Sequence, residues 1–532
     1  MRSTVLFFTS GLAIALSGWT AEALACGCVV TPDVVTPTVQ SGERILFAVQ
    51  DGKVTAHIQI QYQGAGAEFA WLVPLPSIPE VRVGTEALFQ AIDLSTAPSF
   101  WVTRQPAFCG TPDEGGGGFG CGSEDRTLYS GGSTIDAGVA PQPPVLVERS
   151  SAGPYEYAVL RADDSSEMLA WLNNNAYVVP GGTAEAVAPY IHPGAYFLAL
   201  KLRAGESAGS IQPIVLEYNS DLPMIPLILT SVAATNDMGI WVWVLGEHRA
   251  IPRNFQHVVI DDRALVYGVP GQGYEQVLSA AVDQAQDHHA FVTEYAGSSA
   301  TWRGQLSAAV SALDRVRLLG LLDRDQFLAE LRMRVEWSRV APVLETFFPP
   351  PNPLPPGWSR EQYTEGLDRY LADQPKPENF DPTPIVDAIW DRVVTPHLEA
   401  NQLFEDHGFL TRLYTVLSPE EMTADPVFAF NPDLPEVNNV RSVSIVDQCE
   451  GTSITQLGDG RTVEGQGTMQ KAHVEILREE GPPELVQMGV VVDEAQGGEP
   501  TEGCTDGPGR PRGLWPLGIV FLLSWLRWRR RR

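Results

Sequence analysis

The sequence predicts an α+β fold, with a β-rich, sandwich-like N-terminal domain, then a helical region and a C-terminal apolar tail helix. Apolar and polar residues alternate through much of the first 272 residues, which is the period of half-buried strands. From about Gly273 the apolar residues recur at helical spacing. The 532 residues exceed what one hydrophobic core usually organises, so we expect several regions.

Changes in composition and periodicity divide the chain into segments. We expect a signal peptide at 1–25, a β-rich domain at 26–272, a helical region at 273–346, a Pro-rich hinge at 347–357, a second helical region at 358–425, a small strand-bearing segment at 426–480, an acidic and Gly-rich linker at 481–512, and an apolar span with an Arg-rich tail at 513–532.

The β-rich domain begins with expected strands at 43–50, 53–63 and 67–76. Asp51-Gly52 between the first two predicts a two-residue hairpin turn, because both residue types tolerate positive φ. A short helix is expected from Thr85 to Leu94.

Beyond a Gly-rich loop, Asp164 is placed to cap a helix from Ser165 to Asn174, with Glu167 completing a capping box. The strands expected around this helix lie at 145–150, 155–160, 195–202, 211–218, 224–231, 240–246 and 257–260.

The helical regions are expected to contain long amphipathic segments. In the segment 301–320, five apolar residues fall on one helix face: Leu306, Val310, Leu313, Val316 and Leu319. Other helical segments are expected at 274–292, 323–337, 360–372 and 385–417, and strands at 442–446 and 471–477.

The N-terminus has the pattern of a secretory signal peptide. Arg2 precedes an apolar run from Val5 to Ala15, and Ala23-Leu24-Ala25 before Cys26 forms a cleavage site of the A-x-A type. We therefore predict export, with cleavage between Ala25 and Cys26. Lipid attachment at Cys26 is the alternative, although a lipobox would have Leu where this chain has Ala23.

The C-terminus combines a cysteine, a short spacer, a brief apolar span and terminal arginines. Cys504 precedes the spacer, and the span runs from Gly513 to Leu526. The positive-inside rule would hold the terminal cluster on the cytoplasmic side; this cluster is Arg527, Arg529, Arg530, Arg531 and Arg532. The order of parts resembles the myxobacterial C-terminal sorting tail. That resemblance implies cleavage by a sorting protease, with Cys504 as the lipid-linked anchor on the cell surface.

The six cysteines suit disulfides in an exported chain, because oxidising compartments preserve them. Cys109 and Cys121 flank a Gly-rich loop, and a bond across it would stabilise the fold by about 3 kcal/mol through loop-closure entropy. We predict this pair. Cys28 with Cys449 is a further option if Cys26 is lipidated. No C-x2-C spacing supports zinc.

The formal charge of −29 argues against nucleic acid as a partner, because a polyanion would be repelled. The expected partners are instead the export machinery, the sorting protease and the membrane, which the tail would contact.

Several segments in the N-terminal half resemble one known family. These are the stretch 42–84, which opens GERILFAVQ, and the later runs LEYNSDLPMIPLILTS, WVLGEHRAIPRN and FVTEYAG. They are similar to the uncharacterised secreted domain-of-unknown-function family 2330, over roughly residues 26–300. The resemblance implies secretion and a shared fold, and it provides no catalytic residue.

Two glycine motifs have the wrong context for catalysis or phosphate binding. The segment 205–209 matches G-x-S-x-G but lies between two expected strands, where a hairpin loop is the better interpretation. The glycines at 115–120 are followed by no helix, and Asp113 and Glu114 beside them would repel phosphate.

Histidines offer the remaining option for a metal or a general base. His288-His289 with Glu294 forms one loose group, and His397, Glu399, Glu405 and His407 form another. His397 and His407 would lie about 15 Å apart on one helix, too far for one metal. Trp241 and Trp243 share a strand face, for which a sheet core is favoured over a ligand platform.

No cofactor, metal site or catalytic residue is therefore predicted. The leading hypothesis is a non-enzymatic binding or structural protein, exported and displayed at the cell envelope. The alternative is a secreted hydrolase or metal-dependent enzyme, whose site would be sought around His192, His248, His257 or His288.

Overall fold

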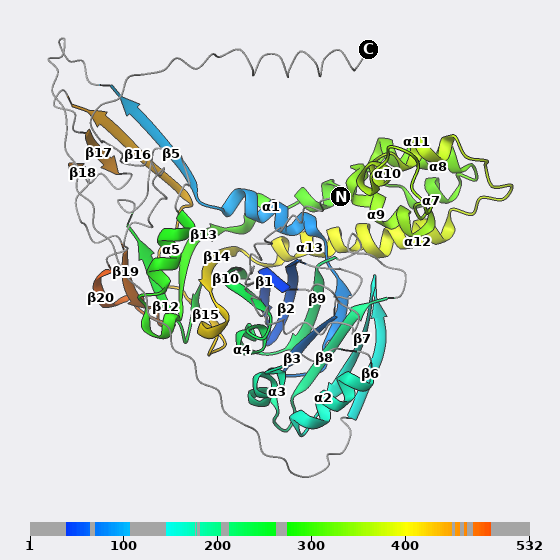
Figure 1. Cartoon of the computed structure of the whole chain (residues 1–532). Coiled ribbons are helices and arrows are strands. Elements are labelled where there is room, and N and C mark those ends of the chain that lie inside the picture. The colour runs from blue at the N-terminus through cyan, green and yellow to red at the C-terminus, as the bar shows by residue number, and fades with distance from the viewer. Residues whose placement is uncertain are drawn as a thin grey trace, which may run out of the picture. The chain divides into compact units, whose positions relative to one another are not determined.

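The computed structural model describes residues 39–63, 70–106, 145–175, 177, 181–203, 212–261, 274–448, 453–457, 462–464 and 472–490. In these residues the fold is mixed α+β, with large sheets in the N-terminal half and helices in the middle (Figure 1). The expected tail helix lies outside the described residues. None of the helices described is long and apolar enough to cross a membrane.

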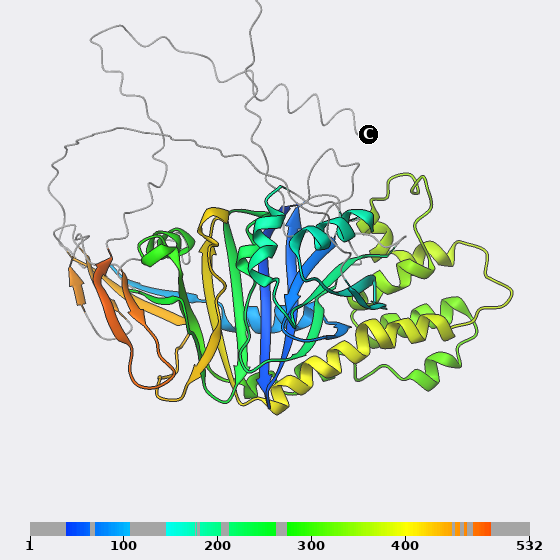
Figure 2. The same ribbon diagram turned by 90° about the horizontal axis from the view of Figure 1, so that it is seen from below.

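The largest sheet has ten strands in the described part of the chain (Figure 2). In spatial order they are β20 (Glu484–Val490), β19 (Ala472–Ile476), β12 (Gln256–Ile260), β13 (Ala290–Ser298), β14 (Phe409–Leu417), β10 (Ala234–Gly246), β1 (Val39–Gln50), β2 (Lys53–Gln63), β9 (Ile214–Asn219) and β4 (Glu80–Val83). Neighbours are antiparallel except β1 with β10 and β12 with β13.

The first hairpin forms as the sequence predicts. Gln50 at the end of β1 pairs with Lys53 at the start of β2, which leaves a two-residue loop. Asp51 and Gly52 occupy it with φ of 51° and 72°. These positive values are those of the turn type that matches the strand twist of a tight hairpin.

A four-stranded sheet packs against one face of the large sheet. Its strands are β3 (Ala70–Leu75), β8 (Tyr196–Leu202), β7 (Tyr155–Arg161) and β6 (Val145–Ala152), in that order. The main hydrophobic core joins inward residues of both sheets, such as Ile45 and Phe47 of β1 with Val73 of β3 and Leu198 of β8. The other face of the small sheet is covered by α2 (Ser165–Asn174), α3 (Thr183–Val187) and α4 (Leu227–Thr230).

The opposite face of the large sheet carries α1 (Glu86–Thr96). Leu88, Phe89 and Ile92 of this helix pack on Leu46 of β1 and Trp243 of β10. The helix starts where the sequence predicts, because the Thr85 hydroxyl accepts a hydrogen bond from the Ala87 amide. The cap on α2 is also confirmed, since the Asp164 carboxylate accepts bonds from two backbone amides of its first turn.

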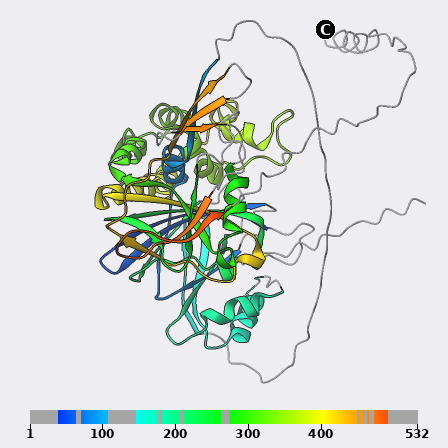
Figure 3. The same ribbon diagram turned by 90° about the vertical axis from the view of Figure 1, so that its left-hand side faces the viewer.

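Two smaller sheets complete the β structure among the described residues. One has the order β18 (Thr462–Glu464), β17 (Ser453–Leu457), β16 (Val440–Asp447) and β5 (Ser99–Gln105), and Figure 3 shows its strands together. The other pairs β11 (Arg249–Pro252) with β15 (Phe428–Asn431).

A group of helices forms a second hydrophobic core, which contains Phe327, Val340, Tyr363 and Ile385. The helices in and beside it are α7 (Arg315–Leu319), α8 (Arg324–Arg334), α9 (Trp337–Phe347), α10 (Arg360–Glu365), α11 (Leu367–Ala372) and α12 (Thr383–Ile389). A π-helical turn at Trp390–Val394 links α12 to α13 (Thr395–Asp406).

Four predicted elements are wrong. The helix expected through 385–417 ends at Asp406, and Phe409–Leu417 is a central strand. Buried strands have no polar alternation, so their period cannot be told from that of a buried helix. The segment 290–298 is strand β13 rather than a continuation of α5 (Tyr274–Val282).

The other two errors concern a strand and a helix. The strand expected at 224–231 is the short helix α4, because Pro226 at its start cannot donate to a ladder. The single helix expected at 301–320 is broken into α6 (Gln305–Ala308) and α7, so Leu306 is buried while Val316 is 82% exposed.

Candidate functional site

A cavity of about 200 Å³ lies between the large sheet and the four-stranded sheet. Apolar side chains from both sheets form most of its wall, among them Ile45, Phe47, Ala56 and Trp71. Strand pairing places them together, since Ile45 lies opposite Ile58 and Phe47 opposite Ala56 in the β1–β2 ladder. The cavity is large enough for a small organic molecule, because an apolar cavity of about 150 Å³ already holds benzene.

One carboxyl side chain, Glu43, lines this apolar cavity from β1. It shares a strand face with Ile45 and Phe47, so the pleat directs it inward and leaves it 2% exposed. Gln40 Nε2 donates a hydrogen bond of 3.3 Å to Glu43 Oε2. No lysine, arginine or histidine of the described residues forms an ion pair with it.

Burial raises the pKa of Glu43 to about 7, and the hydrogen bond from Gln40 opposes this only in part. The carboxyl is therefore balanced between its neutral and charged forms near neutral pH. A cation or hydrogen-bond donor placed beside it in the cavity would favour the charged form. Glu43 was not predicted as a site residue, although its inward position in an otherwise apolar strand is visible in the sequence.

The other polar groups in the wall do not form catalytic machinery. Tyr218 is buried, and burial raises its pKa. The Ser220 hydroxyl donates to the Leu222 carbonyl at 2.8 Å, so it faces no base. His192, named for the enzyme alternative, lines the cavity but is exposed to solvent. The arrangement can bind and orient a molecule, and it offers no nucleophile–base pair.

A second polar group brings together His257, His473 and Glu475 from β12 and β19. His257 Nδ1 lies 3.4 Å from one Glu475 oxygen, and His473 Nε2 lies 2.8 Å from the other. On its other side, His257 Nε2 accepts from the Thr293 amide at 3.2 Å and contacts Thr293 Oγ1 at 2.9 Å. Burial lowers the pKa of His257, so the ring is neutral with its proton on Nδ1.

Thr293, His257 and Glu475 are connected in the order of a nucleophile, a base and a carboxylate, but the threonine is not accessible as a nucleophile. Thr293 is 5% exposed, and Arg249 Nη2 donates to its hydroxyl at 3.1 Å. Neither Thr293 nor His257 lines the cavity between the two sheets. The group holds β12, β13 and β19 together, and its threonine is buried among them.

The histidines of the two groups named from the sequence have separate hydrogen-bond partners in the structure. His397 Nδ1 donates to the Val393 carbonyl at 2.7 Å, and His407 Nδ1 donates to Leu403 O at 2.9 Å, so both bond back to their own helix. Burial lowers the pKa of His397 to about 4. Glu399 lies 3.4 Å from Arg82, and Glu405 is exposed.

His288 meets Asp283 and Glu421, and the ligand atoms of these three lie within 4.8 Å of one another. Among the described residues, this is the set of three histidine, cysteine or acidic side chains that could hold a metal. Glu294, which the sequence grouped with His288, is directed elsewhere. His248 is exposed between β10 and β11.

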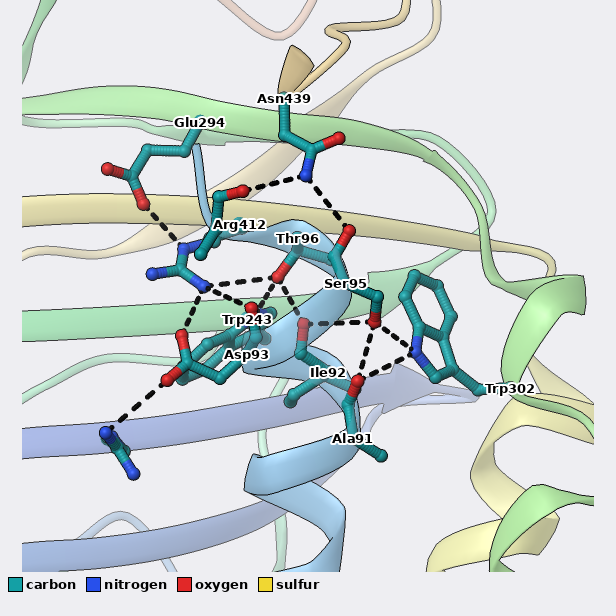
Figure 4. Close-up of polar contacts among 12 residues, drawn as sticks. Ala91, Ile92, Asp93, Ser95, Thr96, Trp243, Glu294, Trp302, Arg412 and Asn439 are labelled. Carbon is teal, nitrogen blue, oxygen red and sulfur yellow. Dashed lines mark hydrogen bonds and ion pairs between the residues drawn. The ribbon is translucent and has the colours of Figure 1, made fainter. Parts of the chain in front are cut away.

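Glu294 belongs to a buried ionic network under α1, shown in Figure 4. Arg412 Nε lies 2.5 Å from Glu294 Oε2, and Arg412 Nη1 lies 2.5 Å from Asp93 Oδ1. Thr96 accepts from the Trp243 indole at 3.0 Å. Burial raises the pKa of Glu294, and Arg412 acts against that rise. The network ties α1 to β13, β14 and β10.

The two tryptophans lie in or against the sheet core, as predicted. Trp243 is fully buried and meets Phe89 edge-on, with ring centroids 5.9 Å apart. Trp241 is half-buried and stacks on Tyr414 at 4.8 Å. Neither ring is an open platform for a ligand.

The remaining sites expected from the sequence lie outside the described residues. These are the cleavage site at Ala25 and Cys26, the pair Cys109 and Cys121, the anchor Cys504, the tail arginines and the two glycine motifs. The cleavage, disulfide, anchoring and topology assignments stay predictions, as do the domain boundaries.

The fold and the cavity define a mixed α+β protein with a ligand-sized apolar space between two sheets. Residues 20–342, more than half of the chain, match the family described as an uncharacterized protein conserved in bacteria (DUF2330), and the protein belongs to this family. This confirms the family resemblance seen in the sequence. No curated protein and no solved structure matches the chain.

Proposed function

We propose that this protein is a non-enzymatic binding protein that holds a small apolar molecule bearing one basic or hydrogen-bond-donating group. The observation that carries the proposal is Glu43, a buried carboxyl without a cationic partner among the described residues, in the wall of an apolar cavity. A perturbed titratable group in an apolar pocket is a common mark of a binding site.

The energetics favour an amine as the polar group of the ligand. Ionised Glu43 is costly because the carboxyl is buried among apolar side chains. A ligand ammonium beside the carboxylate would form a charge-assisted hydrogen bond and remove much of that cost. The apolar walls would bury the rest of the molecule, at roughly 25 cal/mol per Å² of apolar surface.

The test compares benzylamine with ethylbenzene, which has nearly the same shape but no charge. Calorimetric titration of the full chain at pH 7.5 is expected to show tighter binding of benzylamine. In Glu43→Gln the preference for the amine should disappear while ethylbenzene binding is retained. An equal affinity of both variants for benzylamine would contradict the assignment of Glu43.

A matched variant tests the cavity independently of the carboxyl. Ala56 is buried in the wall, and Ala56→Leu adds bulk there without altering Glu43. It should weaken binding of both probes. If neither probe binds to the wild-type chain or to either variant, the cavity is a packing defect and the proposal fails.

We also propose export and display at the cell envelope. The support is the signal-like N-terminus ending at Ala25 and the tail that combines Cys504 with terminal arginines. Non-reducing mass spectrometry of protein from its native envelope should find a chain that begins at Cys26, ends near a modified Cys504 and carries a Cys109–Cys121 disulfide. An intact tail with all its arginines, and free thiols throughout, would contradict surface sorting.

A secreted hydrolase is the second candidate, favoured by the Thr293–His257–Glu475 chain of contacts. If local opening exposes Thr293, the protein should hydrolyse a small activated ester such as p-nitrophenyl acetate. His257→Gln should then abolish that hydrolysis. Equal, slow rates for both chains would exclude this role.

A further inference from the structure

The Asp283–His288–Glu421 cluster lies apart from the cavity and draws on two segments far apart in the sequence. Asp283 follows directly after α5, and His288 closes the short turn Gln286–His288. Glu421 ends a second short turn, Pro419–Glu421, which follows β14. The side chains of Asp283 and His288 are 50% and 42% exposed, so the cluster lies at the protein surface.

Two separations between the ligand atoms fit one metal ion. His288 Nδ1 lies 3.1 Å from Glu421 Oε1 and 3.6 Å from Asp283 Oδ1. Two ligands bonded at about 2.1 Å to a tetrahedral ion are about 3.4 Å apart, and about 3.0 Å apart around an octahedral ion. Both observed separations therefore suit atoms that share an ion.

Hydrogen bonding does not account for the position of His288. Its Nδ1 atom is shielded from solvent and forms no hydrogen bond among the described residues, although both carboxylates lie close. An Nδ1 proton would thus be poorly directed at either oxygen. A nitrogen lone pair shared with carboxylate oxygens around a cation would satisfy all three groups.

The surroundings hold Glu421 and the residue next to His288 in place. The second oxygen of Glu421 accepts from the Ser418 amide at 2.7 Å, which leaves Oε1 directed at His288. The neighbouring His289 is fixed by a contact of 3.1 Å between its Nε2 and Glu421 O, and its ring stacks on Phe255. Such supporting contacts orient metal ligands in known sites.

We propose that Asp283, His288 and Glu421 form a binding site for a divalent transition cation such as zinc. One imidazole nitrogen and two carboxylate oxygens favour zinc or a similar ion over calcium or magnesium, which prefer oxygen alone. Water would take the remaining coordination positions. The ion would join the end of α5 to the turn after β14.

The test is calorimetric titration of the metal-free, tag-free full chain with Zn²⁺ at pH 7.5. His288→Ala should weaken zinc binding by about tenfold or more, because it removes a ligand. The matched control is His248→Ala, since His248 is exposed and outside the cluster; its affinity should equal that of the wild type. Equal zinc affinity in His288→Ala and wild type would overturn the proposal.

A second variant and a spectroscopic measurement keep the proposal testable if His288→Ala does not fold. Asp283→Asn alters an exposed side chain and should also weaken zinc binding. Co²⁺ added to the wild-type chain should give visible d–d absorption that shifts or disappears in Asp283→Asn. An unchanged cobalt spectrum in that variant would assign the metal to other groups and overturn the site.

Discussion

The two faces of the large sheet each bury a glutamate, and the two are handled in opposite ways. Glu43 faces the four-stranded sheet and has one neutral hydrogen-bond partner, Gln40. Glu294 lies under α1, where Arg412 binds it and also binds Asp93. Burial raises the pKa of both carboxyls, but only Glu294 has a cation to offset that rise.

The difference separates a buried charge that is paired within the protein from one that a ligand could pair. Around Arg412 each charge has a partner of opposite sign, so the network stabilises one position of α1 and leaves nothing for a ligand to satisfy. Glu43 has no cationic partner among the described residues, and it borders a cavity that could admit one. Removing the cation that pairs with Glu294 should therefore lower the stability of the protein. Neutralising Glu43 should raise it.

The largest effect is expected from Arg412→Met. This change removes the ion-pair partner of Glu294, while Asp93 keeps Arg44 at 3.4 Å, and breaking a buried pair in this way costs about 3–5 kcal/mol. Urea unfolding at pH 7 measures the loss. The double variant Arg412→Met/Glu294→Leu should lose less than the single variant, because it removes the stranded charge. A double variant that is less stable would show that packing, not charge, holds α1.

Glu43→Gln should have the opposite effect and stabilise the protein. The folded pKa of Glu43, about 7, lies above its ordinary value of 4.5. The unfolded chain thus loses its proton first, and wild-type stability falls as pH rises from 4.5 to 7. Glutamine does not titrate, so the variant should gain up to about 3 kcal/mol at pH 8 and almost nothing at pH 4. An equal gain at both pH values would contradict a raised pKa.

Local signals in the sequence predicted the elements that depend on local chemistry. The Asp51-Gly52 turn, the short helix that begins after Thr85 and the cap at Asp164 are confirmed because a few neighbouring atoms decide them. The helix predicted over strand β14 was wrong because the residues of β14 are buried on both faces and show no polar alternation. Its arginine, Arg412, is the one charged residue in the segment.

The candidate sites depend on residues brought together from distant parts of the chain. Glu43 could be seen as an inward glutamate, but the cavity requires β3 and β9 to pack beside β1. Glu421 is more than 130 residues from His288, so no spacing rule connects them. The sequence instead grouped His288 with Glu294, a near neighbour that the strand turns away toward Arg412.

A smaller effect is expected from His57, which lies on β2, on the α1 side of the sheet. Burial lowers its pKa to about 3, and Arg82 adds to the effect. The unfolded histidine takes up a proton below pH 6.5 while the folded one does not, so stability falls as pH drops from 6.5 toward 3. Between pH 7 and pH 5 this group should cost about 2 kcal/mol.

His57→Leu tests this, because leucine is similar in size and does not titrate. The variant should lose less stability than the wild type between pH 7 and pH 5, measured by urea unfolding. Comparing the two chains cancels the general effect of acid on a protein with a charge of −29. Parallel pH profiles would show that His57 is protonated in the folded state as well.

The smallest effect concerns the start of α1, the helix that carries Asp93 into the network. The Thr85 hydroxyl caps this helix at the Ala87 amide and lies 3.4 Å from His397 Nε2. Thr85→Ala should cost about 1 kcal/mol, the usual cost of losing such a cap, and Thr85→Ser should cost less because it keeps the hydroxyl. In the background of Arg412→Met, the cost of Thr85→Ala should shrink if the network is what holds α1 against the sheet. If Thr85→Ala costs the same in the wild type and in Arg412→Met, apolar packing alone positions the helix. The buried ion pairs would then contribute nothing to its placement.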